Sequence, residues 1–259
     1  MLNKVSPVPL YYQIAEHLKE QIVTGNLASG SRLMAERELG DQFGVSRMTV
    51  RQALNYLHNT GLIEVRQGVG TFVAQPKHTY DALHLASFSE EMSRHGGLVE
   101  STVLVQTLVQ PPPRVAQVLR LADGALALKI TRLRNVRQEP VLMETSFLPA
   151  SLCPGLETAE LAAQSLYALL ETRYGLRLLR TQQTMECVLA NEYEQQIFNL
   201  RAGVAMILLE GVTFSEHDLP IESFKAVYRG DRCKFRLESR RNGLHPEQDG
   251  GQRVSLVVA

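Results

Sequence analysis

The stretch that most constrains the fold of this chain runs from residue 36 to residue 73. Leu39 and Phe43 lie four residues apart, as on one face of a helix, and Gly44 then interrupts the pattern. Ser46 is a good N-cap for a second helix. The apolar face expected for that helix is formed by Val50, Ala53, Leu54 and Leu57. Two helices joined by a tight glycine turn predict a helix-turn-helix.

A hairpin is expected directly after the second helix. Gly61 ends that helix, and residues 62–65 and 71–73 have the composition of short strands. Residues 67–70, Gln-Gly-Val-Gly, join the two strands. A hairpin in this position is a wing. An earlier helix is expected over residues 8–24, where apolar residues recur every four positions and pack beneath the second helix.

The polar residues of this stretch suit double-stranded DNA. Arg47, Thr49 and Arg51 lie in the first turns of the second helix, and a recognition helix meets base edges with its N-terminal residues. Arginine can donate twice to guanine, and a capping serine with free backbone N–H groups suits a phosphate. Wing glycines allow the backbone to approach DNA closely. The predicted DNA contacts are Arg37, Ser46, Arg47, Thr49, Arg51, Gln67, Gly68 and Gly70. The alternative interpretation is a solvated face.

Residues 8–74 resemble the winged helix-turn-helix of GntR-type bacterial transcription regulators. The resemblance rests on PLYYQIAEHLKEQIVTGNL, RLMAERELGDQFGVSRMTVRQAL and QGVGTFV. The family usually has Leu-Pro-Ser before the ERE run, whereas this chain has Leu-Met-Ala. Ala35 cannot cap the helix that follows, so a less firmly fixed helix start is expected.

The rest of the chain predicts an α+β domain, an antiparallel sheet with helices on it. We expect a DNA-binding domain over 1–74, a linker over 75–82, a second domain over 83–239 and a disordered tail over 240–259. Strands are predicted at 99–110, 125–134, 141–148, 181–189, 204–215, 221–228 and 233–238, the last of which closes the sheet. Helices are predicted from residue 87, at 114–121, at 165–174 and at 191–200.

This second domain resembles the effector domain of the HutC branch of the GntR group, called UTRA, whose fold is similar to chorismate lyase. The resemblance rests on SFSEEM, ITRLR, EPVLMETSFLP, SLYALLE and PIESFKAVYRGDR, in that order over about 80–240. Regulators of this branch that sense amino-sugar phosphates use the corresponding positions for phosphate and sugar. The effector-binding residues expected here are Phe88, Ser89, Arg132, Arg134, Glu144, Ser165, Tyr167, Glu222 and Tyr228.

Two arginines carry most of this expectation. Arg132 and Arg134 are two residues apart on a strand and therefore point to one face. Two neighbouring guanidinium groups repel unless an anion lies between them, and serine-led helix starts supply N–H groups for the same anion. The alternative is a surface ion pair between either arginine and Glu144 across the hairpin, which spacing alone favours. The resemblance favours an anionic ligand.

Composition adds little about DNA but bears on the compartment. Basic and acidic residues number 27 each, so only their placement indicates nucleic acid. Three dispersed cysteines and the lack of an apolar run or signal peptide favour the cytoplasm and exclude a membrane protein. The histidines and cysteines show no metal-binding spacing, and no cofactor is indicated.

These observations predict a ligand-responsive transcription regulator, more readily a repressor than an activator. It is expected to bind a palindromic operator as a homodimer, because one recognition helix covers too few base pairs. The expected effector is a small anionic metabolite such as a phosphorylated amino sugar. Alternatives are a non-sugar acid resembling urocanate, an enzyme of lyase-like fold with Glu144 or Glu222 as general acid, or a constitutive DNA-binding protein. The sequence shows no nucleophilic residue paired with a general base, as many enzymes would need.

Overall fold

The computed structural model describes the chain except for residues 1, 76, 82–87, 95–98 and 238–259. The chain separates into two compact units, Met1–His78 and Thr79–Ala259. Within the described residues, no helix combines the length and the apolar character that crossing a membrane requires.

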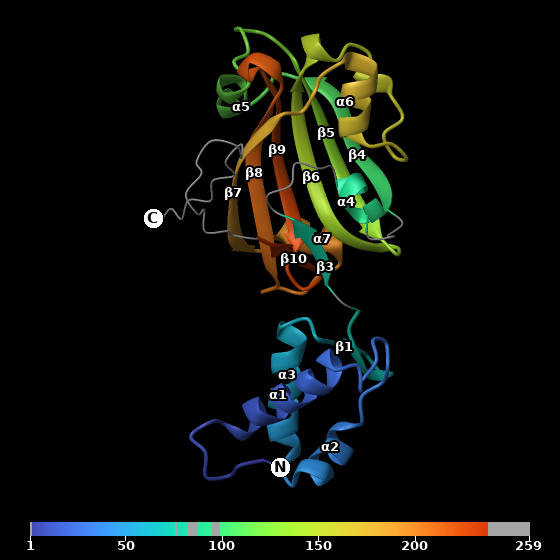
Figure 1. Ribbon diagram of the computed structural model, residues 1–259, viewed down its shortest axis with the longest axis vertical. Coiled ribbons are helices and arrows are strands. Elements are labelled where there is room, and N and C mark those ends of the chain that lie inside the picture. Colours follow the sequence, from blue (N-terminus) through green and yellow to red (C-terminus); the bar gives the residue numbers. More distant parts are fainter. Residues whose placement is uncertain (1, 76, 82–87, 95–98, 238–259) are drawn as a thin grey trace, which may run out of the picture. The chain divides into compact units, whose positions relative to one another are not determined.

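The first unit is a winged helix-turn-helix (Figure 1). It contains α1 (Leu10–Val23), α2 (Glu36–Phe43), α3 (Arg47–Asn59) and the antiparallel wing strands β1 (Ile63–Arg66) and β2 (Gly70–Val73). The apolar face predicted for the second helix is confirmed, because all four of its members are buried in one core with residues of α1, α2 and the wing. This core holds α3 in place and leaves its opposite face exposed.

Local capping explains where the two central helices begin. The Ser46 hydroxyl accepts a hydrogen bond from the Thr49 N–H at 3.2 Å, which caps α3. Gly44 ends α2 with a φ of 62°, a conformation that glycine adopts at little cost. Ala35 offers no side-chain acceptor at the start of α2. The Glu38 carboxylate instead accepts from the Ala35 N–H at 2.8 Å, so half of a capping arrangement remains.

The second unit is built on a six-stranded antiparallel sheet with the order β4-β5-β6-β9-β8-β7. Its strands are β4 (Val99–Val109), β5 (Ala127–Val136), β6 (Glu139–Pro149), β7 (Arg180–Leu189), β8 (Ala205–Phe214) and β9 (Pro220–Arg229). The helices are α4 (Phe88–Arg94), α5 (Pro113–Val118), α6 (Leu166–Tyr174) and α7 (Glu192–Phe198). Short 3-10 turns lie at η1 (Ala150–Leu152), η2 (Leu156–Thr158) and η3 (Glu216–Asp218). The predicted α+β class is confirmed.

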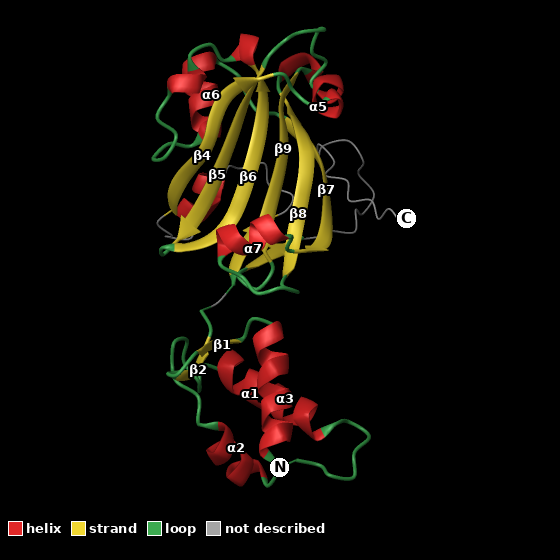
Figure 2. Cartoon of the chain, turned by 180° about the vertical axis from the view of Figure 1, so that it is seen from behind, coloured by secondary structure: helices red, strands yellow, loops and turns green. Residues whose placement is uncertain are grey.

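Helices cover both faces of this sheet. Helices α4 and α6 lie on one face, and α7 lies on the other, as the opposite views of Figures 1 and 2 show. Beneath α4, Phe88 and Met92 pack on Leu142 and Leu209 of the sheet. Beneath α6, Leu166 and Leu170 pack on residues of β5 and β6. The α4 and α6 face therefore carries two apolar clusters, and polar residues on the strands between them are enclosed.

Two expectations about the ends of the second domain require correction. The predicted linker over 75–82 contains a strand, β3 (His78–Asp81), which pairs with β10 (Cys233–Arg236) in a separate two-stranded sheet. The strand predicted at 233–238 therefore does not close the large sheet. Its neighbour in sequence, β9, already pairs with β6 and β8 on its two sides and has no free edge. The predicted tail over 240–259 lies outside the described residues.

Candidate functional site

The exposed face of α3 carries the two arginines expected to contact DNA. The Arg47 and Arg51 side chains are 67% and 52% exposed. Both reach the Glu36 carboxylate at the start of α2: Arg51 donates from Nε and Nη2 at 3.2 and 3.1 Å, and Arg47 Nη2 lies 3.6 Å away. Hydrogen bonding and charge attraction from Arg51 hold the pKa of Glu36 below its ordinary value. The sequence reasoning missed Glu36, which lies 15 residues before Arg51.

The remaining residues predicted to contact DNA are exposed or partly exposed. Ser46 and Thr49 share a hydroxyl hydrogen bond of 2.9 Å at the start of α3, and Arg37 is exposed on α2. At the wing, Gln67 and Gly68 are exposed. The arrangement places cations, hydroxyl groups and bare backbone on the same unit, as phosphate and base contacts require.

Glycine is needed at two positions of the wing. Gly68 and Gly70 have φ values of 74° and 140°, which side-chain-bearing residues rarely adopt. A Cβ at Gly70 would also lie 2.8 Å from Arg32 Nε. Arg66 stacks over the Phe72 ring at 4.4 Å, so two further arginines line this hairpin. The backbone at Gly70 therefore lies against the Arg32 side chain, whereas the position of Gly68 is open.

In the second unit, Arg132 and Arg134 share one carboxylate, that of Glu144, whose side chain is 18% exposed. Only 4% of Arg132 and 1% of Arg134 are exposed. Glu144 Oε1 lies 2.6 Å from Arg132 Nη2 and 3.6 Å from Arg134 Nη1. The strand register produces this contact, because Arg132 on β5 lies opposite Glu144 on β6. The alternative ion pair between the arginines and Glu144 therefore exists. It was expected at the surface, but the arginines are buried because α4 and α6 cover this face.

This cluster of three side chains carries a net charge of +1 and lacks hydrogen-bond partners for several atoms. Arg132 Nε and Arg134 Nε and Nη1 are buried without a hydrogen bond to any described residue. Burial alone would raise the pKa of Glu144, but the two arginines outweigh it and the pKa falls below its ordinary value. Desolvation lowers the pKa of Arg134 despite the attraction of Glu144. Buried N–H donors beside a net positive charge form a setting that an anion would complete.

Both covering helices reach this cluster. Arg134 Nη2 donates to the Ser89 hydroxyl in α4, and its guanidinium lies 5.1 Å from the centre of the Phe88 ring. Arg132 Nη1 donates to the Gln164 carbonyl at 3.5 Å, next to Ser165, which caps α6 by accepting from the Ala168 N–H at 3.2 Å. The structure thus brings Phe88, Ser89 and the start of α6 to the arginines, as the sequence reasoning expected.

Glu222 is the centre of a second buried cluster, in which its carboxylate accepts hydrogen bonds from hydroxyls of the described residues. It accepts from Ser146 at 2.6 Å, from Tyr167 at 2.8 Å and from Thr213 at 3.1 Å. Burial raises the pKa of Glu222, and the hydroxyl donors only partly oppose that rise. Burial also raises the pKa of Tyr167 well above its ordinary value, and Glu222 adds to this effect. The group gathers hydroxyl and carboxyl oxygens on the same sheet face as the arginines.

Tyr228 belongs with Arg134 rather than with Glu222. Tyr228 and Glu222 lie six residues apart on β9, which separates them by about 20 Å along the strand. In the sheet register Arg134 lies opposite Leu142, and Leu142 lies opposite Tyr228. The Tyr228 ring also packs edge-on against Tyr80 and Phe235, with centroid distances of 5.2 and 5.0 Å.

Ser146 and Thr213 are the residues of this face that sequence reasoning missed. Ser146 could have been found, because it lies two residues from Glu144 on β6 and so points to the same face. Thr213 is placed beside Glu222 only by the pairing of β8 with β9. In the part of the chain that the structure describes, no three His, Cys, Asp or Glu side chains are grouped to hold a metal ion.

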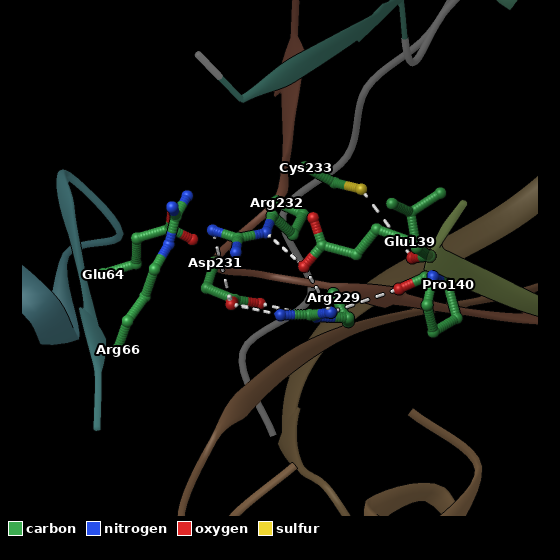
Figure 3. A network of polar contacts seen from close by, with 9 residues as sticks. Glu64, Arg66, Glu139, Pro140, Arg229, Asp231, Arg232 and Cys233 are labelled. Atoms are coloured by element: carbon green, nitrogen blue, oxygen red, sulfur yellow. Dashed lines mark hydrogen bonds and ion pairs between the residues drawn. The ribbon is translucent and has the colours of Figure 1, made fainter. Parts of the chain in front are cut away.

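A separate network of ion pairs lies where β9 ends and β6 begins (Figure 3). Arg229 contacts Asp231 at 2.7 Å and Glu139 at 2.9 Å, and Arg232 contacts Glu139 at 2.8 Å. These residues link the end of β9 to the start of β6. Each arginine of this network contacts a carboxylate within 3 Å.

Comparison with known proteins identifies the same two parts. Residues 10–73 match the model of the gntR family of bacterial regulatory proteins, and residues 94–234 match the UTRA domain. The chain is 36% identical over 234 residues to the transcriptional repressor NagR of Bacillus subtilis, covering 90% of this chain and 96% of that protein. It is 32% identical to the Mannosyl-D-glycerate transport/metabolism system repressor MngR of Escherichia coli, covering 90% of this chain and 97% of that one.

A solved structure supports the fold over both units. The crystal structure of PhnF from Mycobacterium smegmatis superposes with a TM-score of 0.64 at 30% identity, covering 88% of this chain and all of that one. The resemblance inferred from the sequence is therefore confirmed for both domains. The chain belongs to the GntR family of bacterial transcription regulators, with a UTRA domain following the winged helix-turn-helix.

Proposed function

We propose that this protein is a cytoplasmic transcriptional repressor that leaves its operator when a small anionic metabolite, foremost a phosphorylated sugar, binds the second domain. It binds a near-palindromic operator as a homodimer, because one α3 helix reads too few base pairs alone. The names of its relatives support repression, and two refer to sugar compounds: the mannosyl-D-glycerate repressor and a probable fructoselysine utilization operon repressor of Escherichia coli.

The observation that carries this proposal is the cluster of Arg132, Arg134 and Glu144. Two almost fully buried guanidinium groups share one carboxylate and keep N–H donors without acceptors among the described residues. A phosphate beside Arg132 and Arg134 would be attracted by the remaining positive charge and would accept hydrogen bonds from those donors. Charge-assisted hydrogen bonds of this kind are about twice as strong as neutral ones.

The three hydroxyls around Glu222 favour a sugar over a planar acid as the ligand. Tyr167, Ser146 and Thr213 surround a carboxylate on the same sheet face, and such oxygens can exchange hydrogen bonds with sugar hydroxyls. A urocanate-like acid would use the arginines and leave these groups unused. A phosphorylated sugar engages both groups.

The experiment is operator release by candidate ligands, using full-length protein and an operator selected from random-sequence DNA. The ligands are phosphorylated sugars, the same sugars without phosphate, and planar carboxylic acids. The informative variant is Arg134→Met, which leaves the Arg132 and Glu144 pair in place. The matched control is Lys129→Met on the same strand, since Lys129 lies an odd number of residues from both arginines and faces the opposite side.

Wild-type protein and Lys129→Met should release the operator at the same concentration of a phosphorylated sugar. Arg134→Met should need about 10- to 100-fold more ligand, the scale of one charged hydrogen bond. Its operator affinity without ligand should be unchanged. Release of Arg134→Met at wild-type ligand concentrations would refute the anion site, and chemical turnover of the ligand would favour an enzyme instead.

A further inference from the structure

The contact between Arg51 and Glu36 leaves one edge of the arginine without a hydrogen bond to the described residues. Arg51 donates hydrogen bonds from Nε and from one hydrogen of Nη2 to the two carboxylate oxygens of Glu36, at 3.2 and 3.1 Å. A guanidinium group has five N–H donors in a fixed fork, so both hydrogens of Nη1 and the second hydrogen of Nη2 remain. The side chain that carries those donors is 52% exposed.

The free edge of Arg51 matches the acceptors of guanine. Guanine presents O6 and N7 side by side in the major groove, and a two-donor fork fits both. Because Glu36 holds the Nε side of the guanidinium, Arg51 can keep its carboxylate and contact a guanine at the same time. No rearrangement of this ion pair is required when DNA binds.

Glu36 also fixes the spacing between Arg47 and Arg51, the two arginines expected to contact bases. Arg47 Nη2 lies 3.6 Å from Glu36 Oε2, the same oxygen that Arg51 Nη2 contacts. Arg47 and Arg51 are four residues apart on α3 and would otherwise repel each other. Since α2 and α3 pack in one core, the carboxylate is anchored by the rigid part of the unit.

Two physical effects follow for DNA recognition. A free arginine side chain loses about 2 kcal/mol of rotamer entropy when it is fixed, and Glu36 fixes Arg51 before DNA arrives. The negative charge of Glu36 near the phosphates weakens binding to any DNA sequence. The first effect favours the correct site and so raises the ratio of specific to non-specific affinity, whereas the second lowers the affinity for all sites alike.

We infer that Glu36 is a positioning residue, which holds Arg51 so that its outer fork reads a guanine in the operator half-site. This inference rests on the proposed function, since it needs a sequence-specific operator. It assigns to the first residue of α2 a role in specificity that is separate from starting the helix.

Glu38 supplies the matched control. Glu36 and Glu38 are both acidic residues of the first turn of α2, and Glu38 accepts from the Ala35 N–H at 2.8 Å. The changes Glu36→Gln and Glu38→Gln therefore remove the same charge from the same helix end. In the structure, Glu36 holds the reading arginines and Glu38 caps the helix.

The test pairs these variants with a modified base in the selected operator. Each guanine of the half-site is replaced in turn by 7-deazaguanine, which lacks the N7 acceptor, and binding of full-length protein is measured. At the guanine contacted by Arg51, wild-type protein and Glu38→Gln should lose affinity about 10-fold. Glu36→Gln should lose about 3-fold or less there, and Arg51→Ala should lose none. Glu36→Gln should also bind unrelated DNA more tightly than wild type does.

Three results would overturn the inference. They are a 7-deazaguanine penalty in Glu36→Gln equal to that of wild type, equal behaviour of Glu36→Gln and Glu38→Gln, or no guanine whose penalty Arg51→Ala removes. A wild-type protein that selects no DNA sequence at all would instead refute the proposed function.

Discussion

Replacing Glu144 by glutamine should destabilise the second unit, because two buried arginines would lose the one carboxylate that contacts them among the described residues. Breaking a buried ion pair by removing one partner costs about 3–5 kcal/mol. The lower end applies here, since Arg134 keeps the Ser89 hydroxyl and Arg132 keeps the Gln164 carbonyl. For a unit of this size, a loss of about 3 kcal/mol lowers the melting temperature by roughly 6–12 °C.

The assay is thermal and urea unfolding of full-length protein at neutral pH, followed by circular dichroism. Glu210→Gln is the control, because Glu210 on β8 lies one residue from Leu209 and so faces away from the α4 and α6 side. That control should change stability by no more than about 0.5 kcal/mol. Inorganic phosphate should restore more stability to Glu144→Gln than to wild type, compared with sodium chloride of equal ionic strength.

A Glu144→Gln protein whose stability matches that of Glu210→Gln would refute the reasoning. It would mean that the three side chains are hydrated and that their charges do not depend on one another. The same physics predicts the effect of removing both arginines. Arg132→Ala combined with Arg134→Ala leaves the largely enclosed Glu144 without either cation that contacts it in the described structure, so the double variant should be less stable than wild type. Removing the repulsion between the two arginines would not compensate for this loss, because Glu144 already contacts both of them.

Three further predictions concern DNA, coupling and pH. Arg47→Ala or Arg51→Ala should each weaken operator binding by about 1–3 kcal/mol in a gel-shift titration, and a footprint covering a single half-site would contradict the dimer. The fragment 1–76 should bind DNA weakly and show no response to a phosphorylated sugar in the same assay; a response would place the sensing site outside the second domain. Because burial raises the pKa of Glu222 above its ordinary value of 4.5, its contribution to stability is present below 4.5 and is lost as pH rises through the raised pKa. Unfolding measured across this range should show that fall in wild type and not in Glu222→Gln. The lowered pKa of Glu144 gives the opposite sign, with stability lost as pH falls below 4.5.

Much of the fold was predictable because its signals are local. The apolar face of α3, the Ser46 cap and the Ser165 cap each lie within one or two helical turns, and all three are confirmed. The hairpin of β5 and β6 was also predicted, but its turn is tighter than expected. Arg137 and Gln138 adopt φ values of 52° and 66°, although neither is a typical turn residue. Both strands therefore extend further into the expected turn.

Burial of the arginines was not predictable from strand spacing. Alternation along β5 shows that Arg132 and Arg134 share a face, but it does not show whether that face is covered. The cover comes from Ser89, 45 residues before Arg134, and from Gln164, 32 residues after Arg132. The contact of Glu36 with the reading arginines depends likewise on the packing of α2 against α3. Contacts of this kind arise from tertiary structure and leave no periodic signal.

The most direct test of the central claim is the effect of ligand and operator on each other. Calorimetry would measure the affinity of full-length protein for an active phosphorylated sugar with and without saturating operator, and for the operator with and without that sugar. Linkage requires the two affinities to fall by the same factor. We predict a reduction of at least about 5-fold in each, the lower end of typical coupling. Equal sugar affinity with and without operator would contradict the claim that the second domain controls DNA binding.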